Sequence, residues 1–482
     1  MKELIKLCSP TLTWRLQKIT VPAPVSIPEG VTVIFGLNGA GKSTLGAIIE
    51  KGWNITTNRI TTPRTARPTA KMIEFGDIHS LSGFHTEYYQ QRLEATMNDD
   101  VPTVAELLGK RMQMPRWSEL ASRFAMEHVA TKKVNYLSSG ELRKLLLVNT
   151  LLDAPDLLIL DNPYIGLDAE SRDLFNDTLR EIAAAGTSVI LLLCNPVEIP
   201  DFTDMFLPIA DMTLGVPMLA EEGATLTAMR EAAWAMMDYA VDLSAIPGRR
   251  EPVTPHDVTF ALHDCRVAYG PTTILEHVDW TVRRGEGWAL AGPNGSGKSL
   301  LLSLIFADNP QAYSNDITIF DRRRGSGESI WDIKRRIGYV SPEMHLYFRS
   351  GGTVVQVVAQ GLRDTVGNFG AVSAAAREEA MRWLRLFHLE GLADTPYRNL
   401  SAGIQRLVLI ARTFIKHPDL LIFDEPLHGL DAARKRAVRA VVNEIARRDA
   451  PTLVYVTHYL PEVPESITRR FTLTRRFTLT RR

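Results

Sequence analysis

The sequence "GLNGAGKST", residues 36–44, returns as "GPNGSGKSL" at residues 292–300. Both stretches follow the pattern G-x4-G-K-S, in which glycines allow successive backbone N–H groups to surround phosphate oxygens at the start of a helix. The lysine of such a loop reaches the β- and γ-phosphates, and the serine hydroxyl binds Mg²⁺. An apolar run precedes each stretch, "VTVIF" and "GWALA", and a helical pattern follows it. The sequence therefore predicts two nucleoside-triphosphate sites, each between a strand and a helix.

A second part of each predicted site is an aspartate that ends a hydrophobic run. A carboxylate at the C-terminal tip of a buried strand is placed to hold Mg²⁺ through water. We therefore predict the Mg²⁺ ligands to be Ser43 with Asp161 and Ser299 with Asp424. The residues predicted to bind the nucleotide itself are Gly36, Asn38, Gly39, Gly41, Lys42, Ser43 and Thr44, and in the second copy Gly292, Asn294, Gly295, Gly297, Lys298, Ser299 and Leu300.

These stretches belong to a long internal repeat. "YLSSGELRK" (136–144) recurs as "NLSAGIQRL" (399–407), and "LLILDNPYIGLD" (157–168) recurs as "LLIFDEPLHGLD" (420–431). In both copies the aspartate of the "LLI-D" run follows the serine of "LS" by 23 positions. In-register motifs at equal spacing indicate two homologous units.

The units suggest domain boundaries and a fold class. Short β-rich runs alternate with helical stretches in each copy, which favours α/β domains with a mainly parallel sheet. We predict a first domain over 1–210, a helical segment and proline-containing linker over 211–255, and a second domain over 256–468. The remainder, 469–482, reads "RRFTLTRRFTLTRR" and is predicted to be a frayed basic tail, with a basic binding arm as the alternative.

Composition excludes several classes of protein. The 482 residues carry zero formal net charge, which argues against a general nucleic-acid coat protein. The cysteines, Cys8, Cys194 and Cys265, are too scattered for a disulfide framework or a zinc site. No run approaches the ~18–20 apolar residues needed to cross a bilayer, and the N-terminal residues lack a signal-peptide core. We expect a cytoplasmic protein whose membrane role, if it has one, comes through a partner.

The motifs resemble those of the ATP-binding cassette (ABC) ATPases over essentially the whole chain. "LSSGE" and "LSAGIQ" are similar to the family signature, and "GLD" at 166–168 and 429–431 is similar to its D-loop. The resemblance implies two tandem P-loop cassettes, each with a parallel core sheet, an antiparallel β subdomain and a helical subdomain. It also implies ATP and Mg²⁺ as cofactors, and pairing of the two cassettes within one monomer. The signature residues implied to cover the nucleotide of the opposite cassette are Ser138, Gly140, Ser401 and Gly403.

Two family positions separate the copies. The residue after the strand-end aspartate is normally a glutamate that activates water, and a later histidine contacts the γ-phosphate. The second cassette has Glu425 and His458, whereas the same spacing in the first cassette gives Asn162 and Asn195. An amide has no lone pair basic enough to accept a proton at neutral pH. We therefore expect catalysis by Glu425 and His458 and slow turnover at the first site.

The sequence matches other functional positions of the family less closely. Tyr269 is the candidate for stacking on adenine in the second cassette, and Trp14 is a poorer one in the first. For the family's Q-loop glutamine the first cassette offers Gln90 or Gln91, against the alternative of a solvated helix residue. In the second cassette "IGYVSPEMH" (337–345) lacks the glutamine, which weakens the case for ordinary transporter coupling. The basic stretch from 322 to 336 is interpreted as a solvated hairpin and turn, with an acidic partner or nucleic acid as the alternative.

Three functions fit these features. The first is an ATP-hydrolysing engine for a separately encoded membrane permease, working at the inner face of the cell membrane. Molybdate or another oxyanion would be the cargo, because the chain resembles tandem cassettes of molybdate operons. The second is a protein acting on nucleic acid or the ribosome, disfavoured because the segment between the cassettes lacks runs of Lys and Arg. The third is an ATP-gated regulatory scaffold, and the Glu425–His458 pair argues against one that is wholly inactive.

Overall fold

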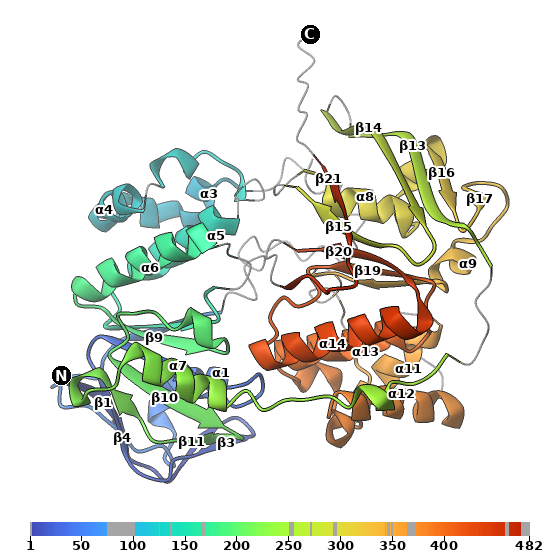
Figure 1. Ribbon diagram of the computed structural model, residues 1–482. Helices are drawn as coiled ribbons and strands as arrows, with labels where there is room; N and C mark the ends of the chain where they lie inside the picture. Colours follow the sequence, from blue (N-terminus) through green and yellow to red (C-terminus); the bar gives the residue numbers. More distant parts are fainter. Residues whose placement is uncertain are drawn as a thin grey trace. The chain divides into compact units, whose positions relative to one another are not determined.

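The chain divides into two compact units, Met1–Asp238 and Tyr239–Arg482. Figure 1 shows the computed structural model, in which the elements of unit 1 run from blue to green and those of unit 2 from green to red. The structure describes residues 2–74, 102–124, 126–134, 137, 139–164, 167, 169–249, 255–269, 272–292, 296–342, 344, 348, 350–363, 372–457 and 462–473.

Unit 1 is built on a mainly parallel sheet whose centre is β5 (Val31–Phe35), β9 (Ser188–Leu193) and β8 (Leu157–Asp161). Every residue of these strands is buried, as expected for parallel strands covered on both faces. The parallel order continues through β7 (Ala70–Glu74) beyond β8 and through β10 (Met205–Ala210) beside β5. Within the described residues the sheet has nine strands, and the other four are β2 (Thr11–Trp14), β3 (Gln17–Thr20), β11 (Thr213–Leu214) and β12 (Met218–Leu219).

A separate antiparallel sheet and a set of helices complete unit 1. The antiparallel sheet joins β4 (Val25–Pro28), β1 (Glu3–Leu7) and β6 (Ile60–Thr61). The helices and 3-10 turns of the described part are α1 (Lys42–Lys51), η1 (Gly52–Asn54), α3 (Val104–Leu108), η3 (Gly109–Gln113), α4 (Pro115–Arg123), η4 (Glu127–Val129), α5 (Ser139–Leu151), α6 (Ala169–Ala184), η6 (Pro196–Glu198), η7 (Ala220–Glu222) and α7 (Leu226–Ala235).

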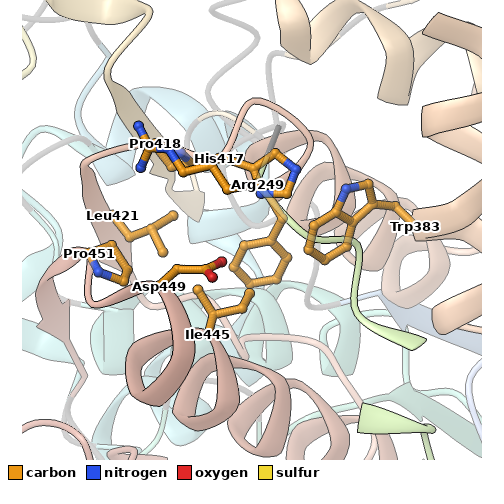
Figure 2. A pocket seen from close by; sticks show the side chains of 9 residues that line it. Arg249, Trp383, His417, Pro418, Leu421, Ile445, Asp449 and Pro451 are labelled. Atoms are coloured by element: carbon orange, nitrogen blue, oxygen red, sulfur yellow. The ribbon is translucent and has the colours of Figure 1, made fainter. Parts of the chain in front are cut away.

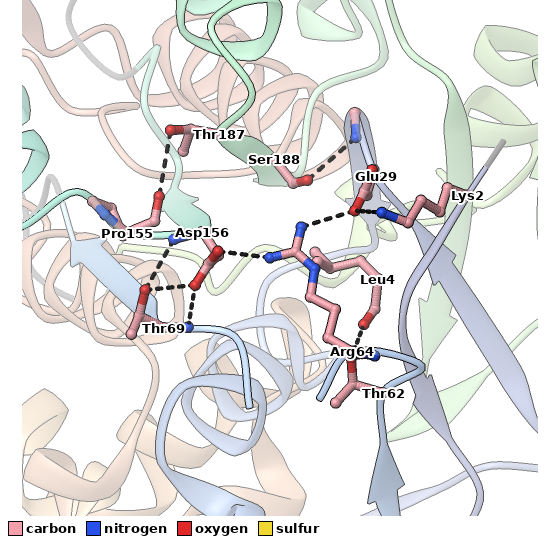
Figure 3. A network of polar contacts seen from close by, with 11 residues as sticks. Lys2, Leu4, Glu29, Thr62, Arg64, Thr69, Pro155, Asp156, Thr187 and Ser188 are labelled. Carbon is pink, nitrogen blue, oxygen red and sulfur yellow. Dashed lines mark hydrogen bonds and ion pairs between the residues drawn. The ribbon is translucent and has the colours of Figure 1, made fainter. Parts of the chain in front are cut away.

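Arg64 joins the two sheets of unit 1. Its guanidinium donates to Asp156 at 2.6 Å and to Glu29 at 2.8 Å (Figure 3). Lys2 adds an ion pair to Glu29, and Asp156 also accepts from the backbone N–H of Thr69 at 2.8 Å. Asp156 and Thr69 directly precede β8 and β7, so this network fixes the ends of those strands opposite the nucleotide loops.

Unit 2 repeats the architecture. Its described residues form a sheet of five parallel strands in the order β18 (Ile337–Val340), β19 (Leu420–Asp424), β20 (Thr452–Val456), β15 (Gly287–Ala291) and β21 (Arg469–Thr472). An antiparallel sheet joins β14 (Thr272–Arg283), β13 (Val258–Tyr269), β16 (Asp316–Ile319) and β17 (Arg322–Arg323).

The helices of unit 2 cover these sheets and form a helical subdomain. In that subdomain Trp383 stacks on Phe414, with 5.3 Å between ring centroids. The predicted fold class is confirmed, because each unit combines a parallel core sheet, an antiparallel sheet and a group of helices. The helices and 3-10 turns described in unit 2 are η8 (Leu243–Ala245), α8 (Lys298–Ile305), η9 (Pro310–Ser314), α9 (Ile330–Lys334), α11 (Val354–Ala359), η10 (Gln360–Leu362), α12 (Ala374–Leu386), η11 (Glu390–Leu392), η12 (Tyr397–Asn399), α13 (Ala402–Phe414) and α14 (Ala432–Asp449).

The predicted linker, residues 211–255, divides between the units. Its strands and α7 belong to unit 1, whereas residues 239–249 belong to unit 2. The Tyr239 hydroxyl donates to the Phe387 carbonyl at 2.6 Å, and Ile246 is buried in the core of unit 2. The proline-rich composition therefore does not make residues 239–249 an exposed linker, because their apolar side chains gain burial on unit 2.

Arg249 ends this docked stretch beside a small pocket of unit 2. Its guanidinium donates to Asp419 at 2.7 Å, and the side chain forms part of the pocket wall. Figure 2 shows the pocket, which Trp383, His417 and Asp449 also line. The docked stretch thus forms part of the packed surface of unit 2.

The first residues of the predicted tail, 469–482, form a strand. This corrects the predicted boundary of the second domain. β21 falls inside the predicted tail 469–482 and pairs in parallel with β15. Phe471 stacks on Trp280, with 4.5 Å between centroids and 10° between planes, and Leu473 is buried. The second domain therefore extends to at least residue 473. Composition alone suggested a tail, whereas β15 supplies backbone partners and Trp280 of β14 supplies an apolar contact.

We expect Phe471→Ala to lower the free energy of unfolding of unit 2 by about 1–3 kcal/mol, because a half-buried ring loses its stack on Trp280. Urea denaturation followed by tryptophan fluorescence measures the change. Thr472→Ser, at an exposed position of the same strand, serves as the control. Equal stability of the two variants would show that the stack of Phe471 on Trp280 contributes nothing to the stability of unit 2.

Candidate functional site

The first phosphate loop connects β5 to α1, as its sequence pattern predicted. Gly39 and Gly41 adopt positive φ angles of 85° and 107°, which glycine tolerates without a steric penalty. The Lys42 ammonium donates to the carbonyls of Gly36 at 2.9 Å and Leu37 at 3.0 Å. The lysine is therefore hydrogen-bonded to the main chain of its own loop. The loop leads into the N-terminus of α1, where backbone N–H groups can bind a phosphate group.

The second phosphate loop has the same construction between β15 and α8. Gly292 and Gly297 have φ angles of 148° and 92°, and the Lys298 ammonium donates to the Gly292 carbonyl at 2.8 Å. Burial lowers the pKa of Lys298, and the carboxylates of Asp424 and Glu425 oppose that shift. Both carboxylates therefore lie close enough to interact electrostatically with this lysine. Asn294 and Gly295, also predicted to bind the nucleotide, lie outside the described residues.

Each loop serine lies against the strand-end aspartate of its own unit. The Ser43 hydroxyl donates to Asp161, and the Ser299 hydroxyl donates to Asp424 at 3.0 Å. Burial raises the pKa of Asp161, against the opposing effects of Ser43 and Lys42. Adjacent hydroxyl and carboxylate oxygens beside a phosphate site fit the hard oxygen ligands that Mg²⁺ prefers. The four residues predicted as Mg²⁺ ligands thus meet as two pairs.

Asn162 and Glu425 occupy equivalent places in the two units. Both have a left-handed backbone, with φ angles of 50° and 47°. Both donate their backbone N–H to the next strand, Asn162 to Leu192 at 3.0 Å and Glu425 to Val456 at 2.9 Å. The backbones match, so the two positions differ only in the chemistry of their side chains.

The Asn162 side chain is engaged within its own site. Its amide nitrogen donates to Asp161 at 2.7 Å, and the Cys194 thiol donates to its amide oxygen at 3.3 Å. Asn195 is used as a cap, because its side-chain oxygen accepts from the backbone N–H of Val197 and its amide donates to Glu198. The side chains of Asn162 and Asn195 therefore both make hydrogen bonds to nearby residues of unit 1. His458, the predicted counterpart of Asn195, lies outside the described residues.

The signature serine of unit 2 lies at a helix start. Ser401 precedes α13, is exposed and makes no side-chain capping bond, while Gly403 in the first turn is buried. In unit 1, Gly140 lies in the first turn of α5, and Ser138 lies outside the described residues. An uncommitted hydroxyl at a helix N-terminus can donate to an anionic ligand.

The other residues predicted to bind the nucleotide differ in their burial and in their contacts. Tyr269 ends β13 with a half-buried ring, and its hydroxyl accepts from the Asn309 amide at 3.3 Å. Trp14 packs against the core of unit 1. Thr44 donates to Gln17, on the strand that follows Trp14, and Leu300 is buried in α8. The predicted Q-loop candidates Gln90 and Gln91 and the D-loop residues Gly166 and Asp168 lie outside the described residues.

Sequence reasoning missed a pair of buried arginines on the helices that follow the signatures. Arg406 of α13 donates to the main chain at Glu425, and Arg143 of α5 donates to the Pro163 carbonyl. Burial lowers the pKa of Arg143 to about 10. The signal was present in the repeat, because both arginines follow the signature serine by five residues. An arginine on a helix is usually exposed, so only burial distinguishes these two.

The chain matches known proteins over both units. The family described as ABC transporter matches residues 25–165 and 275–428. The ABC transporter ATP-binding protein ModF of Escherichia coli is 39% identical over 382 residues, covering 77% of each chain. The molybdenum import ATP-binding protein ModC of Mycobacterium tuberculosis is 35% identical over 190 residues, covering 39% of this chain and 50% of ModC.

A solved structure matches the whole fold. It is the crystal structure of the complex of archaeal ribosomal stalk protein aP1 and archaeal ribosome recycling factor aABCE1, with a TM-score of 0.54 and 18% identity. The match covers 96% of this chain and 87% of the other, and at this identity it shows the fold alone. No helix in the part of the chain that the structure describes is long and apolar enough to cross a membrane. Two matched ranges with the motifs described above show that the chain belongs to the ABC transporter family, as an ATPase with two ATP-binding cassettes.

Proposed function

We propose that the two cassettes are unequal, with ATP hydrolysed in the second and held with slow turnover in the first. The observation that carries this proposal is the pair Asn162 and Glu425, which have matching backbones and different side chains. A carboxylate can accept a proton from an attacking water, whereas an amide cannot at neutral pH. General base catalysis typically contributes about 10²–10⁴ in rate.

In the second cassette, different side chains bind the phosphates, the adenine and Mg²⁺ and activate the attacking water. Lys298 and the N-terminus of α8 bind the β- and γ-phosphates, and Tyr269 stacks on the adenine. Ser299 and Asp424 would hold Mg²⁺, which neutralises charge on the phosphate oxygens when bound. Glu425 orients the water and accepts its proton, and His458 contacts the γ-phosphate.

In the first cassette the binding residues remain while the base is absent. Lys42, Ser43 and Asp161 retain the arrangement of their counterparts, which supports ATP binding. The Asn162 amide donates to Asp161 and so orients that carboxylate.

Asn162→Glu tests the inequality directly. The variant is expected to keep ATP turnover at or above the wild-type rate, because the second site is untouched and the first site gains a base. Steady-state phosphate release at saturating ATP measures the effect. Asn162→Ala, which offers no base, is the control. Complete loss of hydrolysis in Asn162→Glu would show that the first site is already the catalytic one.

For the cellular role, we propose that hydrolysis energises a separately encoded membrane permease, with molybdate or another oxyanion as cargo. Support comes from the relatives, one a molybdenum import ATP-binding protein. The test is capture from detergent-solubilised membranes with the tagged chain carrying Glu425→Gln and loaded with ATP. Recovery of an integral membrane protein only in the presence of ATP is expected, and its absence from the captured material would contradict the role.

The basic stretch 322–336 gives little support to a nucleic-acid role. Arg324 pairs with Glu328 at 2.8 Å with both side chains buried, and Arg336 pairs with Asp419 at 2.6 Å. The stretch also carries ion pairs from Lys334 to Asp308, Arg335 to Asp332 and Arg323 to Asp316. The charges of Arg324 and Arg336 are thus neutralised within the fold and attract a phosphate backbone weakly.

A further inference from the structure

We infer that Arg406 is a positioning residue for hydrolysis, which holds the main chain that carries Glu425. Its guanidinium donates to the carbonyl oxygens of Glu425 at 2.5 Å, Pro426 at 3.0 Å and Ser341 at 2.6 Å. These carbonyls belong to two separate segments, one after β19 and one after β18. A single side chain on α13 therefore joins the C-terminal ends of two neighbouring core strands.

The hydrogen bonds from Arg406 are needed because the backbone at Glu425 has an unfavourable conformation. Its φ angle of 47° lies in the left-handed region, which costs a residue with a side chain on the order of 1–3 kcal/mol. Such a conformation persists only where the surroundings fix it. The N–H of Glu425 is fixed by Val456, and its carbonyl accepts from Arg406 and from the backbone N–H of His428 at 3.2 Å, so both peptide groups flanking its Cα are anchored. The direction of the Glu425 side chain depends on these anchors, of which Arg406 is the one supplied by a side chain.

The positions of the three carbonyl oxygens match the donors of an arginine side chain, and a shorter donor would not reach them all. Arg406 is 1% exposed, and its planar group serves carbonyls in several directions from one buried point. Hydrogen bonds from a charged donor are stronger than neutral ones, so the loss of Arg406 removes the strongest donor from these carbonyls and leaves the Glu425 carbonyl with the backbone N–H of His428. Lysine can reach one or two of these oxygens as a point donor but lacks the fork that fixes all three.

Arg406 also connects two functional segments along α13. The helix begins directly after Ser401 and reaches Arg406 in its second turn. One side chain of α13 therefore links the helix that begins after Ser401 to the main chain at Glu425. The inference rests on the proposed function, because it matters for turnover only if Glu425 is the base.

The test compares Arg406→Met and Arg406→Lys with the wild-type chain. Arg406→Met is expected to lower kcat by roughly 10²-fold, as displacement of a reacting group by about 1 Å does, with KM for ATP changed less than about 3-fold. Arg406→Lys is expected to recover part of that loss. Combined with Glu425→Gln, Arg406→Met is expected to lower hydrolysis no further, because the base that it positions is already gone.

Arg412→Met is the matched control. Arg412 lies on the same helix, is 3% exposed and places its guanidinium over Phe348 at 5.4 Å, whereas Arg406 donates to the Glu425 carbonyl. We expect this variant to lose stability in urea denaturation and keep its kcat. A merely structural role for Arg406 would give equal kcat values for the two methionine variants at equal loss of stability, and would overturn the inference.

The outcomes separate this inference from the proposed function. Wild-type hydrolysis in Glu425→Gln would refute the proposed function and the inference together. Inactive Glu425→Gln with wild-type kcat in Arg406→Met would leave the proposed function standing and refute the positioning role. Should Arg406→Met fail to fold, Arg406→Lys decides: reduced kcat with unchanged KM supports the role, and wild-type kcat refutes it.

Discussion

Glu425→Gln is expected to reduce multiple-turnover ATP hydrolysis by about 10²–10⁴-fold, the range that general base catalysis supplies. The substitution keeps the size and hydrogen-bonding shape of the side chain and removes its capacity to accept a proton. It makes the second cassette resemble the first, where Asn162 stands at the same left-handed position. ATP binding should persist, because Lys298, Ser299 and Asp424 are unchanged, so ATP-bound closure should be stabilised.

Two measurements check this expectation. Phosphate release under excess ATP gives the loss of turnover, and retention of ATP after rapid gel filtration gives the stability of the ATP-bound state. Asn162→Gln is the matched control, since it changes an amide for an amide at the equivalent residue. A Glu425→Gln variant that keeps more than half of the wild-type rate would contradict the assignment of Glu425 as the base.

Lys298→Ala is expected to have a comparable effect by a different route. Loss of its ammonium removes a charge-assisted hydrogen bond to the phosphates, worth roughly 1.5–3 kcal/mol, or about 10- to 150-fold in affinity. The same charge stabilises the transition state, so hydrolysis at saturating ATP should fall by a further factor of about 10². The Lys298 ammonium donates to the Gly292 carbonyl at 2.8 Å, and alanine at this position keeps a residue that favours helix at the start of α8.

Lys42→Ala provides the comparison within one chain. Both lysines donate to the first glycine carbonyl of their loops, at 2.9 Å and 2.8 Å. Equilibrium dialysis with labelled ATP should therefore show weakened binding at one of two sites in either variant. With ATP high enough to fill both sites, Lys42→Ala is expected to hydrolyse at least about tenfold faster than Lys298→Ala, since only the latter acts at the site with a base. Equal rates, or the reverse order, would contradict an unequal pair.

Much of the fold could be predicted because its signals are local. The glycine-lysine loops, the apolar strands that end in Asp161 and Asp424, and the equal spacing of the repeat each depend on short segments. The C-terminal strand could not be predicted in this way. Basic, repetitive composition favoured a tail over 469–482, whereas pairing with β15 and the stack of Phe471 on Trp280 come from distant parts of the chain.

The sequence by itself determined that this chain has two cassettes and that just one of them carries a glutamate after its strand-end aspartate. Only the tertiary structure decided that residues 239–249 dock on unit 2, and that Arg406 holds the main chain at Glu425. The physical reason is separation along the chain. A hydrogen bond between Arg406 and Ser341 joins residues 65 positions apart, and no local pattern of residue types encodes such a contact.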